Sequence, residues 1–183
     1  MKIRPLTGIA EVEAVERVID SARDHCLFLL GIQTCLRGSQ LVAIRLGEAR
    51  RTVSTGGALS FAHKLRSKTR THSRVLHPLR TRLSLGLDQR ALKALSKLVD
   101  ERAGAADDDL LFVTADGHGL RPEALTRLWK SWAAKAGLPG RLTASSGRLT
   151  FLARMGYLPM IATVVQPAPY DFREPMKRLG DGP

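Results

Sequence analysis

The sequence lacks the features that would place the protein in a membrane or direct it out of the cell. Its 183 residues contain no apolar run approaching the roughly 20 residues that a membrane-spanning helix needs. The N-terminal stretch MKIRPLTGIAEVEAVERVID alternates acidic and aliphatic residues and has no apolar core of the kind that a signal peptide carries. We therefore expect a cytoplasmic protein.

Cysteine and aromatic residues are also scarce. The two cysteines, Cys26 and Cys35, form no CxxC pair and have no histidine pair nearby, so we expect small apolar side chains and no metal or redox site. Aromatic residues make up 5% of the chain, which disfavours an RNA- or ribosome-associated protein that stacks bases on clustered rings. A GxxxxGK[ST] stretch for nucleotide phosphates is missing as well.

Acidic residues are missing from one long part of the chain. Residues 49–87 contain no carboxylate, while the whole chain has 29 Lys and Arg against 17 Asp and Glu, a net charge of +12. A fold does not need such a run, whereas binding to a polyanion does, although a solvated basic face is the simpler alternative. A membrane surface is disfavoured because the run forms no amphipathic helix. Its basic residues are Arg50, Arg51, Lys64, Arg66, Lys68, Arg70, Arg74, Arg80 and Arg82.

Hydrophobic periodicity predicts a single domain over residues 1–183 that is mostly helical with one small antiparallel β-sheet, an α+β fold. Residues 51–80 lack helical periodicity and are rich in Thr, Ser and Val, which predicts hairpin strands around KLRSKTRTHSRVLHPL. LLFVT is expected to be a short strand or an extended segment. Helices are expected over residues 9–22 and 23–36, from Ser39 through SQLVAIRL, after an Asp88 cap, from Pro122, and from Ser146 to Met155.

Three segments together resemble a known family. LFLLGIQTCLRGSQLVAIRLGEAR, which contains Arg37, resembles the first arginine motif of tyrosine recombinases, the phage-integrase family, whose usual form is T-G-L-R-x-S-E/D-L. SKTRTHSRVLHPL is similar to that family's β-hairpin with its K-T signature, and DDLLFVTADGHGLRPEALTRLWKSWAAKAGL to the segment before its second motif. The resemblance covers residues 22–140 and continues weakly to Tyr170. It implies the catalytic domain without the family's N-terminal core-binding domain.

The resemblance gives Arg37 and Lys68 roles in the cleavage of DNA. Arg37 would grip the scissile phosphate, because a guanidinium pairs bidentately with phosphate oxygens and stays charged; a surface arginine on an amphipathic helix is the alternative. Lys68 would protonate the departing 5′ oxygen as a general acid. Lys64 is the alternative for that role, and a lysine that only binds phosphate is the simpler interpretation of either.

The family's second motif, H-x-x-R, has two candidates here. HGLR, from His118 to Arg121, has the right letters but precedes the helix that should come before the motif, so we interpret it as coincidence. SSGR, from Ser145 to Arg148, lies in the expected place. Arg148 then matches the second arginine and Ser145 replaces the histidine, and a serine does not act as a base at neutral pH without help.

The C-terminal part departs further from the family. The last histidine is His118, so the family's third histidine or tryptophan is missing, and Gln166 and Pro167 stand where Gly and His belong. The resemblance implies a tyrosine nucleophile. Tyr157 comes too early for that role, which leaves Tyr170, with an ordinary partly exposed tyrosine as the alternative.

The function implied is site-specific DNA recombination or integration, with strand cleavage and rejoining through a 3′-phosphotyrosyl intermediate and without metal or nucleotide cofactor. A catalytically inactive, DNA-binding relative that assembles with an active recombinase is the alternative. The partner is double-stranded DNA, which implies a nucleoid-associated protein, monomeric in solution and tetrameric on DNA. Phe172 and Met176 would dock the C-terminal segment on a neighbour unless that segment is a frayed tail. The residues expected to bind DNA are Arg50, Arg51, Lys64, Arg66, Arg70 and Arg74.

Overall fold

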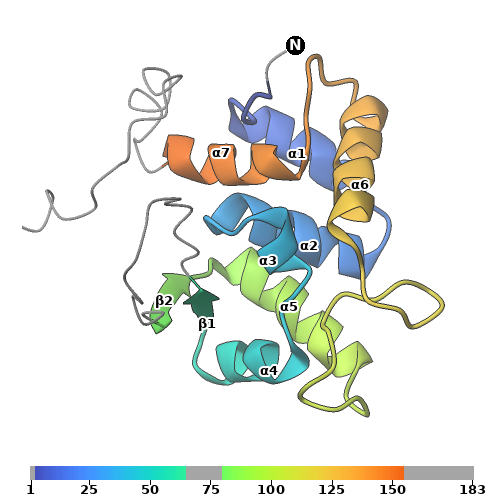
Figure 1. The fold of residues 1–183 in the computed structure, drawn as a ribbon. Coiled ribbons are helices and arrows are strands. Elements are labelled where there is room, and N and C mark those ends of the chain that lie inside the picture. The colour runs from blue at the N-terminus through green and yellow to red at the C-terminus, as the bar shows by residue number, and fades with distance from the viewer. Residues whose placement is uncertain (1–2, 65–79, 155–183) are drawn as a thin grey trace, which may run out of the picture.

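The structure is a computed structural model that describes the backbone of residues 3–64 and 80–154 and the side chains of residues 3–59 and 86–154. Figure 1 shows the order of its elements. No helix within these ranges is long and apolar enough to cross a bilayer. The elements are α1 (Ile9–Arg17), α2 (Ala22–Gln33), α3 (Gly38–Leu41), α4 (Leu46–Ser54), β1 (Ala58–Lys64), β2 (Arg80–Gly86), α5 (Gln89–Glu101), α6 (Pro122–Lys135) and α7 (Ala144–Arg154).

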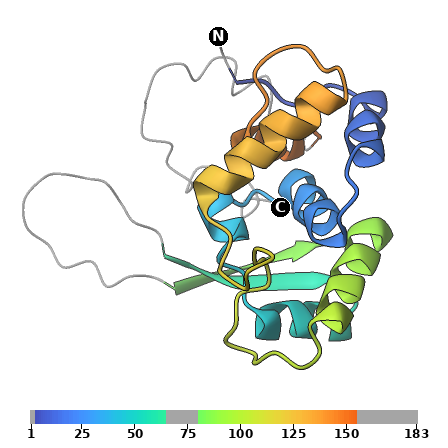
Figure 2. The same cartoon turned by 90° about the vertical axis from the view of Figure 1, so that its right-hand side faces the viewer.

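Helix α2 is the centre of the molecule. A helix that is apolar on all sides must be surrounded by protein, and the four consecutive residues 27–30 of α2 are fully buried. Helices α1, α6 and α7 lie on one side of α2, and α5, α4 and the strands lie on the other (Figures 1 and 2). The buried helix expected from RDHCLFLLGIQTCL is therefore confirmed, but it ends at Gln33 and not at Leu36, because the backbone turns extended at Thr34.

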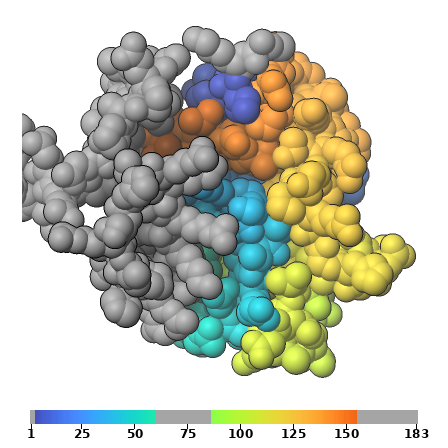
Figure 3. Space-filling view, viewed as in Figure 1, coloured from blue at the N-terminus to red at the C-terminus, as the bar shows by residue number. Residues whose placement is uncertain are grey.

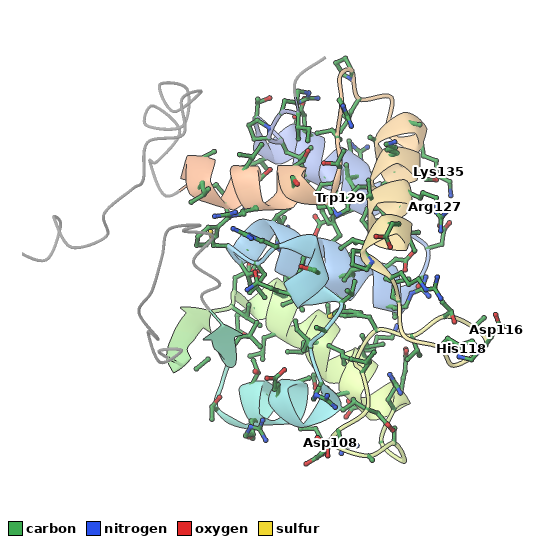
Figure 4. The ribbon with its side chains drawn as sticks, viewed as in Figure 1. Asp108, Asp116, His118, Arg127, Trp129 and Lys135 are labelled. Carbon is green, nitrogen blue, oxygen red and sulfur yellow. The ribbon has the colours of Figure 1, made fainter. Side chains whose placement is uncertain are left out.

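An aromatic cluster packs α6 against α2. The ring centroid of Phe28 lies 5.3 Å from that of Trp129 and 6.0 Å from that of Trp132, within the range in which aromatic pairs attract each other. Trp129 points from α6 into the molecule, while Arg127 and Lys135 point outward from the same helix (Figure 4). The cluster fixes the position of α6, which in turn supports α3 and α7.

The strands β1 and β2 form a two-stranded antiparallel sheet. Their register runs from Ala58 opposite Gly86 to Lys64 opposite Arg80. The strands flank the basic stretch in which the hairpin was expected, and residues 65–79 between them lie outside the described residues. Leu59 is fully buried where β1 packs beside α4. The mostly helical α+β fold is therefore confirmed.

Two predicted helix starts are confirmed by their caps. The Asp88 carboxylate accepts a hydrogen bond from the Ala91 N–H at 2.9 Å at the start of α5, and Pro122 occupies the first turn of α6. Burial raises the pKa of the Asp88 carboxyl, but the hydrogen bond from the Ala91 N–H, with the positive charge of Arg90, outweighs this effect, so the pKa lies below its ordinary value. The cap therefore stays ionised at neutral pH.

The predicted bounds of the first and last helices are corrected by the structure. Helix α1 ends at Arg17, and the next helix starts at Ala22 because Ser21 Oγ accepts a hydrogen bond from the Asp24 N–H at 3.2 Å. Helix α7 begins at Ala144, two residues before the expected start. Its expected last residue, Met155, lies outside the described residues.

The expected helix from Ser39 through SQLVAIRL is wrong. Helix α3 ends at Leu41, and a separate helix, α4, begins at Leu46. Between them the chain pairs with the segment that contains LLFVT: the Leu111 N–H donates to the Ile44 carbonyl at 2.8 Å. This pairing uses backbone groups that a continuous helix would need, and it holds LLFVT extended.

Candidate functional site

The chain leaves α2 through a turn that delivers Arg37 to the surface. Thr34 is fully buried at the end of α2, and its hydroxyl donates to the Leu30 carbonyl at 2.7 Å. Arg37 then takes an extended backbone conformation as the cap residue of α3, and its N–H donates to Gln40 Oε1 at 2.8 Å. The Arg37 side chain is exposed at the start of α3.

Close packing brings the start of α3 against the start of α7. A Cβ atom added at Gly38 would lie 3.2 Å from the Ala144 Cβ and 3.3 Å from Leu125 Cδ2. The absence of a side chain at Gly38 therefore lets Arg37 lie beside the first residues of α7. Gly38 stands next to the arginine in the motif for this steric reason.

The tightest helix contact in the site lies between α2 and α7. A Cβ atom added at Gly147 would lie 2.6 Å from the Gly31 carbonyl oxygen and 2.9 Å from Trp129 Cζ2. Ser146 fixes the start of α7, because its hydroxyl accepts a hydrogen bond from the Thr143 N–H at 3.0 Å. Arg148 follows this crossing by one residue, so its Cα position is set by the buried core.

Arg37 and Arg148, which are 111 residues apart in the chain, line the same pocket. The pocket has a volume of about 480 Å³. In Figure 3 the segment around α3 (cyan) reaches the surface beside α7 (orange) and α6 (yellow). The described lining residues are Ile3, Arg37, Gly38, Ser145, Arg148, Leu149 and Leu152.

The charge of this pocket suits an anion. No described lining residue carries a carboxylate, and neither arginine forms an ion pair with a carboxylate among the residues that the structure describes. Two guanidinium groups that line one pocket and have no carboxylate partner among the described residues are chemically suited to bind phosphate oxygens. Within residues 3–59 and 86–154, no group of three or more His, Cys, Asp or Glu side chains is placed to hold a metal ion.

Arg148 has one side-chain partner that the sequence analysis missed. Its Nε–H donates to Cys35 Sγ at 3.4 Å, from a position 113 residues away along the chain. The sequence predicted only a small apolar role for Cys35, and no spacing pattern could have revealed the contact, because it depends on the packing of α7 against α2. Cys26, by contrast, is fully buried as expected.

The N-terminal segment forms one wall of the pocket, which was also missed. Ile3 lines the pocket with 38% of its surface exposed and pairs with Arg141 in a parallel bridge. The segment is held in place because the Leu6 N–H donates to the Thr150 hydroxyl at 2.9 Å. Thr150 and Arg148 both belong to α7, so this helix positions the N-terminal wall of the pocket as well as the arginine.

His118 lies far from the pocket. It is exposed on the turn with Asp116, on the side of the molecule away from α7 (Figure 4), and its carbonyl accepts a hydrogen bond from the Thr114 N–H at 2.7 Å. The HGLR stretch therefore belongs to a turn outside the pocket. Ser145, from the other candidate for the motif, lines the pocket and is exposed.

Several predicted site residues fall where the structure gives no side-chain position. Lys64 is the last residue of β1, with its backbone opposite Arg80. The other predicted site residues of this kind lie outside the described residues; they are Arg66, Lys68, Arg70, Arg74 and Tyr170.

Arg50 and Arg51, both expected to bind DNA, differ in their surroundings. The Arg50 guanidinium is bonded to the Asp107 carboxylate and to the carbonyls of Ala103 and Ala105 at 3.0 and 2.9 Å, so most of its donors are used within the protein. Arg51 is exposed. The contacts of Arg50 join α4 to the loop after α5, which gives this arginine a role in the fold.

Solved structures of DNA recombinases share this fold. XerA recombinase matches with a TM-score of 0.64 and 13% identity, over 99% of this chain and 67% of that chain. The XerH site-specific recombinase bound to difH substrate matches with a TM-score of 0.58 and 16% identity, over 98% of this chain and 51% of that chain. The Tn1549 transposon integrase in complex with transposon right end DNA matches with a TM-score of 0.59 and 19% identity, over 97% of this chain and 66% of that chain. The fold is that of a tyrosine recombinase catalytic domain.

The sequence itself matches the model of the phage integrase family over residues 10–166. The chain therefore belongs to the phage integrase family. No curated protein matches the sequence. The chain spans 67%, 51% and 66% of the lengths of the three solved recombinases above.

Proposed function

We propose that the protein carries out site-specific DNA recombination, in which it cleaves and rejoins DNA strands through a phosphotyrosyl intermediate. The observation that carries the proposal is that Arg37 and Arg148 line one pocket whose described lining residues include no carboxylate. Membership of the phage integrase family supports it. We propose further that the 183 residues act as one unit that corresponds to the catalytic domain of that family.

The proposed chemistry uses three kinds of side chain. The Tyr170 hydroxyl attacks a DNA phosphorus in line and loses its proton to solvent, a bond from the Tyr170 oxygen to the 3′ phosphate forms, and the bond from phosphorus to the 5′ oxygen breaks. Lys68 gives its proton to the departing 5′ oxygen. Arg37 and Arg148 stabilise the charge that develops on the non-bridging oxygens. Attack by a 5′ hydroxyl on the phosphotyrosine reverses these steps, rejoins the backbone and conserves the bond energy.

Ser145 stands where the family motif has a histidine, and it lines the pocket. A hydroxyl donates a hydrogen bond to a phosphate oxygen but exchanges no proton at neutral pH. We propose that Ser145 binds the phosphate and that proton transfer relies on Lys68. A positioned acid or base contributes about 10²–10⁴ in rate, so we expect slower cleavage than in a site with a histidine.

Trapping the covalent intermediate tests the nucleophile. A pool of nicked duplexes of randomised sequence lets the short 5′ fragment diffuse away after cleavage, so that the protein stays bound to its DNA in a denaturing gel. We expect an adduct with the wild-type protein that is lost in Tyr170→Phe. The matched control is Tyr157→Phe, which removes the only other tyrosine and should keep the adduct. Cleavage that survives Tyr170→Phe would refute the assignment.

The arginine pair is tested in the same assay. Arg37→Ala and Arg148→Ala should each lower the rate of adduct formation by about 10²–10³, the usual loss for one preplaced donor. The control, Arg17→Ala, removes the same charge from an exposed position of α1 outside the pocket. Salt-sensitive duplex binding without adduct in any protein would instead support the inactive, DNA-binding relative.

We propose that the basic residues of the hairpin region bind the DNA backbone beside this pocket. They are Lys64, Arg66, Arg70 and Arg74, with Arg51 from α4. Arg50 is left out because its guanidinium bonds within the protein. We propose further that the protein is a monomer in solution and assembles as a tetramer on DNA through the segment with Phe172 and Met176, which analytical ultracentrifugation with and without duplex will test.

A further inference from the structure

The contact between Arg148 and Cys35 restricts how the guanidinium can turn. An arginine has five N–H donors in a planar fork, and here the Nε–H donates to Cys35 Sγ at 3.4 Å. With that edge of the fork occupied, the four N–H groups of the two Nη atoms remain for a ligand in the pocket. A phosphate would then be held by the Nη pair, end-on, and not by the edge formed by Nε and one Nη.

Buried neighbours on both sides of Cys35 restrict the position of its sulfur. The residue before it, Thr34, is fully buried and bonded to the Leu30 carbonyl, and the residue after it, Leu36, is 2% exposed. Cys35 itself is half-buried and does not line the pocket. Its sulfur therefore contacts Arg148 without belonging to the described wall of the pocket.

We propose that Cys35 is a positioning residue, which holds the Arg148 guanidinium with its two Nη groups turned toward the phosphate that Arg37 also contacts. The proposal rests on the proposed function for the identity of the ligand, but the contact itself does not. In the usual family motif a glycine stands at this place, so the sulfur is a feature of this chain. Sulfur is a weak acceptor, and we expect a modest effect that acts only through Arg148.

A double-mutant cycle tests this role. Binding of a fluorescent intact duplex, which does not trap the covalent adduct as a nicked one does, is measured by anisotropy at fixed salt for the wild-type protein, Cys35→Ala, Arg148→Ala and the double variant. One hydrogen bond corresponds to about a 2- to 10-fold change in affinity. We expect Cys35→Ala to lower the affinity for DNA by this factor in the wild-type background and to leave the affinity unchanged in the Arg148→Ala background. Cys35→Ser, which keeps an acceptor, should bind like the wild type, and Cys26→Ala is the matched control.

A second readout observes the contact without DNA. The Nε–H signal of Arg148 in a ¹⁵N-labelled sample is assigned by its loss in Arg148→Lys. We expect this signal to shift in Cys35→Ala and to stay in place in Cys26→Ala, which removes the other thiol of the chain. Thermal unfolding of each variant confirms that it is folded. Should Cys35→Ala fail to fold, Cys35→Val, which fills the site but accepts no hydrogen bond, replaces it.

The outcomes separate this inference from the proposed function. Three outcomes overturn the positioning role alone. The first is an equal loss of affinity for Cys35→Ala in both backgrounds, and the second is no loss for Cys35→Ala when Arg148→Ala clearly weakens binding. The third is an Arg148 Nε–H signal that does not move in Cys35→Ala. Wild-type and Arg148→Ala proteins that bind the duplex equally overturn the proposed phosphate site, and the positioning role with it.

Discussion

The two thiols of the chain differ in chemistry because they differ in burial. Cys26 is fully buried in α2, and burial raises the pKa of its thiol to about 12, whereas Cys35 is half-buried beside Arg148. Since the thiolate is the reactive form, N-ethylmaleimide at pH 8 should modify Cys35 and leave Cys26 intact until the protein unfolds. Mass spectrometry of proteolytic peptides checks this, and equal labelling of both cysteines in folded protein would contradict it.

Ser145 offers a test by gain of activity. It is exposed, lines the pocket and takes the place of the family histidine, so an imidazole there reaches the same ligand. We expect Ser145→His to raise the rate of adduct formation by about 10²-fold, the lower end for a positioned acid or base. Ser145→Ala is the control, and it should lower the rate by about 2- to 10-fold, because it removes one hydrogen bond to the phosphate. An unchanged or lower rate for Ser145→His would show that the pocket does not use a histidine.

At this scale the sequence predicted residues that belong to motifs and missed those defined only by packing. Arg37 and Arg148 were predicted because each matches a short motif of the family, and they line one pocket, while their roles stay predictions. The contact between Cys35 and Arg148 joins residues 113 positions apart, and the Arg50 contacts with the loop after α5 span 53 and 55 positions. No local pattern encodes such pairs, because they appear only when helices pack.

The crossing of α2 and α7 is the element that fixes the arginine pair. Replacing Gly147 by Ala gains about 1 kcal/mol of helix propensity. The new Cβ would, however, lie 2.6 Å from the Gly31 carbonyl oxygen, a backbone atom that cannot turn away. Overpacking typically costs about 1–3 kcal/mol, so we expect the clash to win and Gly147→Ala to lower the free energy of unfolding. Urea denaturation measures the change.

Gly104 provides the matched glycine. A Cβ atom added there meets nothing within 4 Å, so Gly104→Ala should leave the free energy of unfolding nearly unchanged. If Gly147→Ala is as stable as the wild-type protein, the helices can separate without cost, and the position of Arg148 is not set by the crossing as we describe it.

The N-terminal segment is attached to α1 by a pair of charges that titrates in acid. The Arg4 guanidinium binds both Glu11 oxygens, at 2.9 and 3.0 Å, and this hydrogen bonding holds the pKa of the Glu11 carboxyl below its ordinary 4.5. A lowered folded-state pKa stabilises the protein above pH 4.5, and that contribution is lost as the pH falls through the folded pKa. Thermal unfolding between pH 7 and 3 should show a smaller acid-induced loss in Glu11→Gln than in the wild-type protein.

The control for this titration is Glu13→Gln. Glu13 is exposed in the same helix, so its variant should lose stability in acid as the wild-type protein does. Identical acid profiles for Glu11→Gln and the wild type would show that the charge pair does not hold the N-terminal segment.

Elements with a strong apolar period were predicted well, and elements defined by long-range pairing were not. Helices α2 and α6 follow from runs such as CLFLLGI and from the Pro122 start. Helix α4 was missed, because its start depends on the Leu46 N–H donating to the Asp109 carbonyl at 2.9 Å, a contact between distant parts of the chain. Hairpin strands were predicted around residues 64–79, and the described strands, Ala58–Lys64 and Arg80–Gly86, lie on either side of that stretch. Local signals therefore located the region of the hairpin but not the bounds of its strands.

The net charge of +12 gives the whole molecule a measurable salt dependence on DNA. Contacts to about 6–8 phosphates should give a slope of about −5 to −7 when log Kobs for duplex binding is plotted against log salt concentration. Anisotropy titrations between 50 and 200 mM salt measure this slope. A slope near zero would show that the basic run does not bind the DNA backbone. Removal of Arg51, Arg66 or Arg74 should make the slope less negative by about one for each residue.

The wall that Ile3 contributes to the arginine pocket has a practical consequence for handling the protein. Because Leu6 is bonded to α7 at Thr150, the chain runs past the pocket before it reaches α1. An affinity tag or fusion partner joined ahead of this segment extends the chain from a residue that lines the pocket. We therefore expect a tagged protein to bind duplex more weakly than the same protein after the tag has been cleaved off.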